Sequence, residues 1–319
     1  MAVVTLYQPL DMSTIYSWYG DVTVATASQI RITDGYRMQD YYGSFQYDSY
    51  GLSGGYVTST AAYAGNARVF EASDFNVNAV TLESYIDYDA QAALALVLSG
   101  NDEIRGSNGS DLLIGYAGND RLYGNGGNDL FIADPGSDWI DGGAGLDVVY
   151  YASPARNYSV FNNGGFKVSD NAGNVDSLVS IERLVFADSK VLALDIGFGQ
   201  HAGAAYRLYQ AAFDRVPDRE GLAFWVGQLD AGSTFFQVAQ GFVQSPEFQR
   251  LNPDMSNDAI LNNYYLNVLG RPADAEGLAY WSQQMANGMP ASEALFWFSE
   301  SAENMANTNP AIESGIWLV

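Results

Sequence analysis

The fold is decided by residues 97–150, which divide without insertion into six nonapeptides: VLSGNDEIR, GSNGSDLLI, GYAGNDRLY, GNGGNDLFI, ADPGSDWID and GGAGLDVVY. Each nonapeptide has a glycine, an aspartate two residues later and an apolar residue two residues after that. The glycines are Gly100, Gly109, Gly118, Gly127, Gly136 and Gly145, and the aspartates are Asp102, Asp111, Asp120, Asp129, Asp138 and Asp147. A fixed period kept at three positions indicates a repeat architecture.

Each unit predicts a glycine-rich turn followed by a very short strand whose single apolar residue points inward. If two units make one coil, residues eighteen apart stack, and stacked strands lie about 4.8 Å apart. Asp102 then lies over Asp120, and Asp111 lies over Asp129. Calcium takes oxygen ligands at roughly 2.3–2.6 Å, so a cation midway between two stacked turns reaches a carboxylate from each.

Electrostatics indicate that this fold depends on a metal. Two carboxylates about 5 Å apart repel each other by roughly 3 kcal/mol at an effective dielectric constant near 20. A column of such pairs stays unbalanced without a cation. The alternative interpretation is an acidic, glycine-rich flexible linker. A flexible linker would not keep glycine, aspartate and an apolar residue at the same three positions in six successive units.

The nonapeptides resemble the RTX, or haemolysin-type, calcium-binding repeats, whose consensus is G-G-x-G-x-D-x-U-x. The resemblance implies a right-handed parallel β-roll, with Ca²⁺ between turns held by the aspartates and by backbone carbonyls of the glycine turns. Six repeats stacked n on n+2 form four pairs, so about four interior calcium sites are expected. The first unit departs from the consensus at Val97 and Leu98, and the fifth departs at Ala133, Asp134 and Pro135.

Composition narrows the possible partners. The chain has 319 residues and a net charge of −23, with Lys167 and Lys190 as its lysines. This balance argues against nucleic acid and anionic membrane surfaces and favours cations. Cysteine is absent, which excludes disulfides and thiolate metal sites.

The two ends of the sequence bear on export. The N-terminal residues have neither a basic region nor a sustained apolar region, so a cleaved signal peptide is not expected. No apolar run approaches the length of a membrane span. The RTX resemblance implies the type I secretion machinery of Gram-negative bacteria, which reads an uncleaved C-terminal signal. Residues 313–319 (ESGIWLV) fit such a tail, so we expect a secreted, extracellular or cell-surface protein.

Residues 1–96 are expected to form a Tyr- and Gly-rich β domain that ends in a capping helix. Alternating residues predict antiparallel strands at 29–33, 43–47, 55–59 and 67–71. Residues 88–98 have helical propensity, with Asp87 or Asp89 as the cap, and this helix is expected to cover the open first coil. Exposed tyrosines there could bind a glycan or a protein, or they could be cross-strand packing pairs.

Residues 151–200 are expected to be a β cap and linker that closes the roll, as a solenoid requires. Strand alternation appears at 158–161 and 166–169. The segment also resembles the cap that commonly follows RTX repeats. Asp170, Asp176 and Asp188 are candidates for one more ion.

Residues 201–319 have helical periodicity and contain a second internal repeat. Residues 206–225 (YRLYQAAFDRVPDREGLAFW) align without a gap on residues 262–281 (NNYYLNVLGRPADAEGLAYW) at an offset of 56. Asp218 and Asp274 are placed to cap a second helix in each copy, and Ser245 precedes another that begins with proline. An all-α domain of two duplicated helical units is expected.

This second repeat resembles the DUF4214 family, which has no assigned activity and often accompanies RTX repeats. The theme LGRxxDxxGLxYW is carried by residues 269–281, and Asp214 replaces its glycine in the first copy. We interpret Trp225 and Trp281 as core residues. Arg215 and Arg271 are expected to pair with the nearby acidic residues: Asp218, Glu220 and their counterparts.

No catalytic site is expected. The single histidine, His201, stands in a glycine-rich hinge and is interpreted as a surface residue. An HExxH helix is absent, which argues against the zinc proteases that often carry RTX repeats. Ser53 lies in a G-x-S-x-G sequence, but that elbow requires a strand leading into a helix, whereas Ser53 is expected in a turn between short strands.

The whole sequence therefore predicts a multidomain, non-enzymatic, secreted calcium-binding RTX protein. Its fold is completed by Ca²⁺ outside the cell, and its expected role is structural or in assembly at the cell surface or in extracellular matrix, with self-association as one consequence. The alternative is a monomeric adhesin module that binds a glycan or a protein. A secreted hydrolase with an unrecognised site in residues 1–90 is the third hypothesis.

Overall fold

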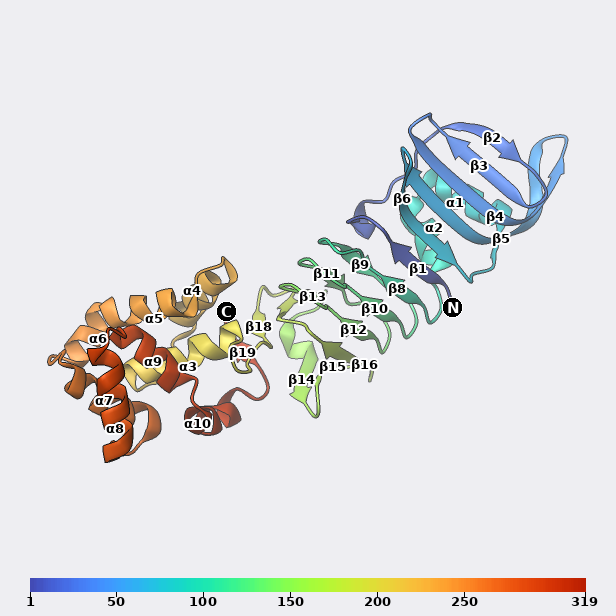
Figure 1. Ribbon diagram of the computed structural model, residues 1–319. Coiled ribbons are helices and arrows are strands. Elements are labelled where there is room, and N and C mark those ends of the chain that lie inside the picture. Colours follow the sequence, from blue (N-terminus) through green and yellow to red (C-terminus); the bar gives the residue numbers. More distant parts are fainter. The chain divides into compact units, whose positions relative to one another are not determined.

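The first strands of the chain build one curved antiparallel sheet. The computed structural model describes residues 1–319, which group into two units, residues 1–188 and 189–319 (Figure 1). The first elements are β1 (Val3–Leu6), β2 (Asp21–Ala25), β3 (Gln29–Thr33), β4 (Arg37–Asp48), β5 (Gly51–Ala64), β6 (Ala67–Ser73) and β7 (Val77–Asn78). Strands β2 to β6 pair antiparallel in chain order, and β1 pairs antiparallel with β6. The four predicted strands are confirmed as parts of β3, β4, β5 and β6.

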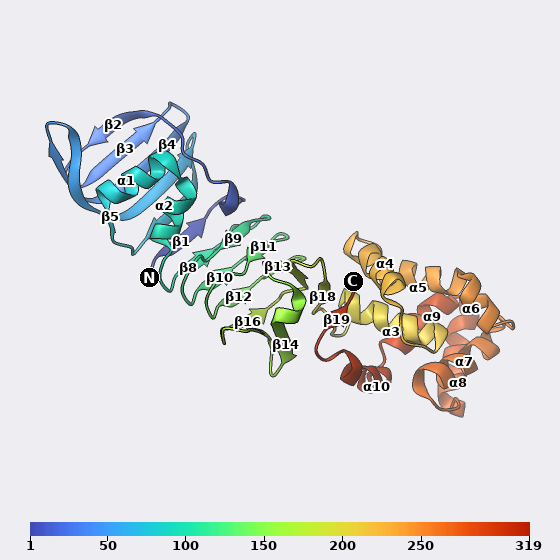
Figure 2. The same cartoon turned by 180° about the vertical axis from the view of Figure 1, so that it is seen from behind.

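Two helices follow this sheet, α1 (Ala79–Tyr88) and α2 (Ala90–Val97). Asn78 accepts a hydrogen bond from the N–H of Thr81 to cap α1, and Asp89 caps α2 through Ala92. Both helices lie on the same face of the curved sheet (Figures 1 and 2). The helix α2 and its cap Asp89 were predicted, whereas α1 lies within the expected β domain and was not predicted.

The nonapeptides form the predicted coils. Their strands are β8 (Glu103–Arg105), β9 (Leu112–Ile114), β10 (Arg121–Tyr123), β11 (Leu130–Ile132), β12 (Trp139–Asp141) and β13 (Val148–Tyr151). They stack in parallel as β8–β10–β12 and β9–β11–β13, with residues eighteen apart paired. The apolar residue of each unit is fully buried inside the roll: Ile104, Leu113, Leu122, Phe131, Ile140 and Val149.

The first coil is closed by the start of the chain and not by the expected helix. Strand β1 pairs in parallel with β8, and Asp11 bridges to Leu112. A strand can satisfy the open N–H and C=O groups of a sheet edge, whereas a helix has its own backbone groups already paired. The expectation that the helix of residues 88–98 covers this edge is therefore corrected: β1 pairs with it.

The other end of the roll continues beyond the nonapeptides. The elements there are β14 (Tyr158–Asn162), β15 (Phe166–Asp170), β16 (Val175–Val179) and β17 (Arg183–Phe186). Strand β16 stacks in parallel on β12, and β17 stacks in parallel on β13. The hairpin β14–β15 contains the two strands that the sequence predicted in this segment.

Residues 189–319 are mostly helical. The elements are β18 (Val191–Ala193), α3 (His201–Phe213), α4 (Arg219–Asp230), α5 (Phe235–Gln244), α6 (Pro246–Leu251), α7 (Asn257–Leu269), α8 (Ala275–Ala286), α9 (Ala291–Ser299), α10 (Ala302–Ile312) and β19 (Ile316–Trp317). Asp218 caps α4 and Asp274 caps α8, each through the glycine three residues on, and Ser245 caps α6 with proline at its first position. These three caps were predicted. None of the helices has the length and hydropathy of a membrane span.

Aromatic and aliphatic side chains form the core of this helical unit. Trp225 stacks on Phe242 with ring centroids 4.6 Å apart, and Trp281 packs on Phe298 at 5.0 Å. Both tryptophans are half-buried at the edge of this core. Arg215 pairs with Asp218, as predicted, and also with Glu247.

Candidate metal centre

The six aspartates of the nonapeptides point into the structure. Their exposed fractions lie between 0% and 4%. Each one ends a glycine-rich turn and immediately precedes a strand of the roll, so the strand register holds all six in two columns. The predicted stacking of residues eighteen apart is confirmed.

Backbone hydrogen bonds link the aspartates of each column. The N–H of Asp102 donates to Oδ1 of Asp120 at 2.7 Å, and the N–H of Asp120 donates to Oδ1 of Asp138 at 2.8 Å. The second column has the same two links, Asp111 to Asp129 and Asp129 to Asp147, each at 2.8 Å. One carboxylate oxygen of each acceptor is thereby fixed at the turn of the preceding coil.

Both columns extend beyond the nonapeptides. At the start of the roll, the N–H of Ala2 donates to Asp102, and the N–H of Leu10 donates to Oδ1 of Asp111 at 2.6 Å. At its other end, the N–H of Asp138 donates to Oδ1 of Asp176 at 3.0 Å. The N–H of Asp147 donates to Oε2 of Glu182 at 2.8 Å. The flanking segments therefore continue the pattern of the repeats with different residues.

The second carboxylate oxygens have fewer partners. Oδ2 of Asp120, Asp129 and Asp147 is buried without a hydrogen-bond donor. By contrast, Oδ2 of Asp111 accepts from the N–H of Ser107 at 2.6 Å. A buried carboxylate oxygen without a donor or a cation is costly, so these three positions call for a positive charge.

Asp134 adds a third carboxylate to one of these positions. Ligand oxygens of Asp120, Asp134 and Asp138 lie within 4.8 Å of one another, and both oxygens of Asp134 are buried without a partner. In the sequence, Asp134 stands out only as a departure from the repeat consensus. A carboxylate in place of a turn glycine, eighteen residues after Tyr116 in the stacked coil, was the signal that could have identified it.

Pro135 accounts for the different backbone of Asp134. The second residue has a left-handed conformation in the third, fourth and sixth nonapeptides, with φ of 71° at Tyr116, 70° at Asn125 and 91° at Gly143. Asp134 does not have a positive φ, because a following proline restricts a residue to extended conformations. The departure from consensus therefore produces a different turn.

The turn glycines leave space in which oxygen atoms gather. A Cβ added at Gly124 would lie 2.2 Å from Oδ2 of Asp129 and 2.4 Å from the carbonyl oxygen of Gly142. Carboxylate and carbonyl oxygens are the ligands of hard cations such as Ca²⁺. The oxygen atoms and the space between them both fit such an ion. The methyl group of an alanine at position 124 would collide with these oxygen atoms.

Burial also raises the pKa values of the carboxyls. Desolvation raises the pKa of Asp120 and that of Asp129 to about 6, and neighbouring aspartates add to the effect. Desolvation, followed by the charge of Asp138, raises the pKa of Asp134 to about 8. Without a cation, this cluster favours the protonated form.

A second polar ladder runs beside the aspartates and was missed by the sequence analysis. The N–H of Asn119 donates to Oδ1 of Asn101 at 2.9 Å, and the N–H of Ser137 donates to Oδ1 of Asn119 at 2.8 Å. The other column has matching bonds from Asn128 to Ser110 and from Leu146 to Asn128. Short polar residues directly before the aspartates were its sequence signal.

The three aspartates proposed for one more ion do not come together. Asp176 belongs to the column of Asp138, and its Oδ2 accepts from the hydroxyl of Tyr151. Asp170 accepts from Ala172 and Asn174 within its own turn, and Asp188 accepts from Ala155. These three carboxylates have separate partners and do not form a group close enough to share an ion, so this expectation is wrong.

The two residues weighed for catalysis differ from expectation in position. Ser53 lies within β5 at a register irregularity, and not in a turn between short strands. A strand continues after it, so the helix of a nucleophile elbow is missing. His201 is the first residue of α3, and its Nδ1 lies 2.8 Å from Oδ1 of Asp230. The hinge expected around His201 is therefore helical from this residue onward.

Comparisons with known proteins agree with this geometry. Residues 98–131 and 123–153 match the model of the RTX calcium-binding nonapeptide repeat (4 copies). Residues 200–252 and 239–308 match the domain of unknown function DUF4214. The chain carries RTX repeats and DUF4214 domains. Both resemblances inferred from the sequence are confirmed.

Similarity to solved structures is partial. The extracellular lipase LipA from Serratia marcescens matches with 28% identity and a TM-score of 0.29, over 31% of this RTX chain and 18% of the lipase. The AlgE6R3 subunit of the mannuronan C5-epimerase from Azotobacter vinelandii matches with 22% identity and a TM-score of 0.21, over 28% of this chain and 81% of that subunit. No curated protein matches the chain.

Proposed function

We propose that this chain is a secreted RTX protein whose roll is completed by Ca²⁺ outside the cell. The observation that carries the proposal is the set of buried carboxylate oxygens without donors at Asp120, Asp129 and Asp147, joined by both oxygens of Asp134. Bound Ca²⁺ supplies the positive charge that such oxygens lack. The RTX match supports calcium as the ion.

The calcium ligands are the aspartates of the columns and the backbone carbonyls of the turns. About four interior sites follow from the stacked pairs. The residues that hold the ions are Asp102, Asp111, Asp120, Asp129, Asp138 and Asp147, with Gly100, Gly109, Gly118, Gly127, Gly136 and Gly145 in the turns. Asp134 adds its charge to the site between Asp120 and Asp138.

Export and folding are coupled in this proposal. Calcium is scarce in the cytosol and abundant outside cells, so the stacked aspartates of each column repel one another before export and are bridged by Ca²⁺ afterwards. A chain that is unfolded in the cytosol suits type I secretion from a Gram-negative bacterium. The extracellular space or the cell surface is then where the folded protein acts.

The proposed role is structural, in assembly at the cell surface or in extracellular matrix. Helices α3 and α7 both have 13 residues, and α4 and α8 both have 12. We infer that the helical unit is a duplication and that the segment of β14 to β17 caps the roll. Repeated modules without an assigned activity suit contacts between copies, and self-association is expected.

The alternative is a monomeric adhesin that binds a glycan or a protein through its N-terminal sheet. A group of exposed tyrosines along the hairpin of β4 and β5 favours it: Tyr42, Tyr47, Tyr50 and Tyr56. Tyrosine offers a large contact area at a small entropic cost. A hydrolase remains the third hypothesis, and replacement of Ser53 or His201 with measurement of hydrolysis tests it.

A calcium titration with two readouts tests the main proposal. Circular dichroism should show β structure appearing as Ca²⁺ replaces a chelator, and light scattering on the same samples should show growth to large particles. Mg²⁺ at the same concentration is the control, because it demands a smaller octahedral site. A roll already formed in chelator would contradict the calcium-dependent fold. A monomer at high protein concentration would contradict assembly and favour the adhesin.

A further inference from the structure

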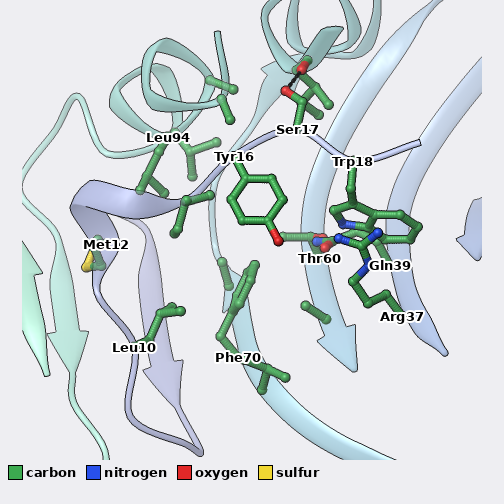
Figure 3. A pocket seen from close by; sticks show the side chains of 18 of the residues that line it. Leu10, Met12, Tyr16, Ser17, Trp18, Arg37, Gln39, Thr60, Phe70 and Leu94 are labelled. Atoms are coloured by element: carbon green, nitrogen blue, oxygen red, sulfur yellow. Dashed lines mark hydrogen bonds between the residues drawn. The ribbon is translucent and has the colours of Figure 1, made fainter. Parts of the chain in front are cut away.

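A cavity of about 450 Å³ lies in the N-terminal part of the chain, between the curved sheet and the helices (Figure 3). Strands β3 to β6 supply one wall. Helices α1 and α2 and the segment of residues 10–18 supply the others. The volume falls within the range of small-molecule sites, roughly 300–1,000 Å³.

The walls of this cavity are mainly apolar. Ile32, Met38 and Phe70 come from the sheet, and Met12 and Leu94 lie toward the helices. The charged residues of the lining are Asp11 and Arg37. Asp11 is occupied as the cap of a short helix, where its Oδ1 accepts from the N–H of Ser13 at 2.9 Å. An aqueous filling would find few polar partners on such walls.

Several polar groups of the lining lie together at one side of the cavity. Figure 3 shows Arg37, Trp18 and Gln39 near one another there, with the ring of Tyr16 reaching toward them. Tyr16 lines the cavity and is also 70% exposed, so the cavity reaches the surface at this residue. Nε2 of Gln39 donates to Oγ1 of Thr60 at 2.6 Å.

Arg37 has donors to spare at this opening. Its Nε donates to Oδ2 of Asp34 at 2.8 Å, and its guanidinium lies 4.8 Å from the ring centroid of Trp18. The Nη atoms keep the paired, planar geometry that suits a carboxylate. The cation–π contact with Trp18 helps to hold the guanidinium beside the cavity.

We propose that this cavity binds a long-chain fatty acid, with the hydrocarbon chain inside and the carboxylate at Arg37. An apolar space of this volume is costly to leave empty, and a hydrocarbon chain fills it with dispersion contacts along both walls. Arg37 pairs with Asp34 through Nε, and its two Nη atoms remain as parallel donors for the carboxylate of one head group. The inference does not rest on the calcium columns, although Leu10 both lines the cavity and donates its N–H to Asp111.

Binding is tested on the full chain in calcium with cis-parinaric acid, a fatty acid that fluoresces in apolar surroundings. Saturable binding of one probe per chain is expected. Ala62→Trp places a large ring in the cavity from β5 and should weaken binding on the order of tenfold or more. Ala67→Trp is the matched control, because Ala67 is exposed and lies outside the cavity lining. Ala67→Trp should bind like the wild type.

A second filling variant guards against a folding defect. Ala90→Leu enlarges the opposite wall from α2, and circular dichroism identifies any variant that has lost its fold. Wild-type protein without saturable binding would overturn the proposal. Equal binding by Ala62→Trp, Ala90→Leu and Ala67→Trp, with all three folded, would also overturn it, because the probe would then bind elsewhere.

The head group is tested separately. Arg37→Gln should weaken binding of the fatty acid about tenfold. The same substitution should leave binding of the corresponding fatty alcohol unchanged, as measured by displacement of the probe. A fatty alcohol that binds wild type as tightly as the acid would overturn the assignment of the carboxylate to Arg37.

Discussion

Asp134 places a third carboxylate beside Asp120 and Asp138. Asp134→Asn keeps the size of the side chain but removes its charge, and calcium affinity depends on the number of ligand charges. We expect the affinity of this one site to fall on the order of tenfold, which corresponds to about 1.4 kcal/mol. Calorimetric titration with Ca²⁺ measures it. Asp21→Asn, at an exposed position, is the control, and equal affinities in the two variants would show that Asp134 contacts no cation.

The calcium-free roll should become more stable as the pH falls. Burial raises the pKa of Asp120 and that of Asp129 from 3.8 to about 6. The folded state therefore binds these protons more tightly than the unfolded state does. Their stabilising contribution is complete below about pH 3.8 and is lost as the pH rises through about 6.

Calcium affinity should change in the opposite direction, because the ions need ionised carboxylates. Circular dichroism in chelator at about pH 7.5 and about pH 5 follows the first effect, and titrations with Ca²⁺ follow the second. Asp34 has a pKa lowered to about 2 by hydrogen bonds from Arg37 and Tyr36, so it stays ionised over this range. A calcium-free roll that unfolds further at the lower pH would contradict the prediction.

At this scale, regular spacing made the six aspartates predictable, because their period follows directly from the pitch of the coil. Asp134 was not predictable, because its position depends on a turn that Pro135 alters, and its neighbour Asp120 belongs to the coil two repeats earlier. The polar residues before the aspartates, such as Asn119, were equally regular. Their hydrogen bonds run between coils, and a local sequence pattern does not specify such partners.

At the scale of the turn, crowding distinguishes two glycines that share a left-handed conformation. Gly127 has φ of +103°, and a Cβ there would lie 2.5 Å from backbone atoms of Gly109 and Ser110. Gly164 has φ of +72° with nothing within 4 Å. Gly127→Ala should lower the free energy of unfolding by about 3 kcal/mol or more, and Gly164→Ala by about 1 kcal/mol. Urea unfolding in calcium measures both, and equal losses would mean that the coils separate to accommodate a methyl group.

A buried ion pair joins the middle of α3 to the C-terminal end of α9. Arg207 is 0% exposed, and it donates to Glu300 through Nε at 2.5 Å and Nη2 at 2.9 Å. Its Nη atoms also donate to the carbonyls of Ile196 and Gly197. Arg207→Met leaves the carboxylate of Glu300 buried without its cation, which costs about 3–5 kcal/mol.

Thermal unfolding of the helical signal measures that loss. Arg215→Met is the matched control, because Arg215 forms its ion pairs at the surface and such pairs contribute about 1 kcal/mol or less. If the two variants lost equal stability, the pair of Arg207 and Glu300 would be solvated in solution.

Elements with a strong local signal agreed with the sequence, and those set by distant partners did not. The strands of residues 29–33 and 67–71 alternate polar and apolar residues, and the caps at Asp218 and Asp274 are local. Helix α1 is rich in aromatic and β-branched residues, which favour strands, yet Asn78 caps it and the sheet covers it. The pairing of β1 with β8 joins segments about a hundred residues apart, and neither strand specifies the other.

At the scale of the whole molecule, the four sequence segments 1–96, 97–150, 151–200 and 201–319 stay predictions. In the structure, residues 1–188 form one compact unit, because β1 and β16 continue the roll at its two ends. The sequence marked a change of periodicity at each boundary. Hydrogen bonding across such a boundary depends on the register of the coils, which only the folded chain fixes.

Calcium should therefore stabilise one unit of the chain and leave the other unchanged. The acidic columns lie within residues 1–188, whereas the helical unit has its own apolar core from Ala193 to Leu318. An ion that binds only the folded state stabilises it by about 2.7 kcal/mol per site at a hundred times its dissociation constant. Two calorimetric transitions are expected, and only the one that carries the β signal should move with calcium.

Asp129→Asn separates this outcome from a general effect of salt. The N–H of Asp129 donates to Oδ1 of Asp147, its Oδ1 accepts from the N–H of Asp111, and its Oδ2 has no donor. The substitution therefore removes one carboxylate charge from the middle of one column. The calcium-dependent shift of the β transition should shrink while the helical transition keeps its temperature. If one cooperative transition moved as a whole with calcium, the helical unit would depend on the roll for its stability, and folding after export would have to involve both units at once.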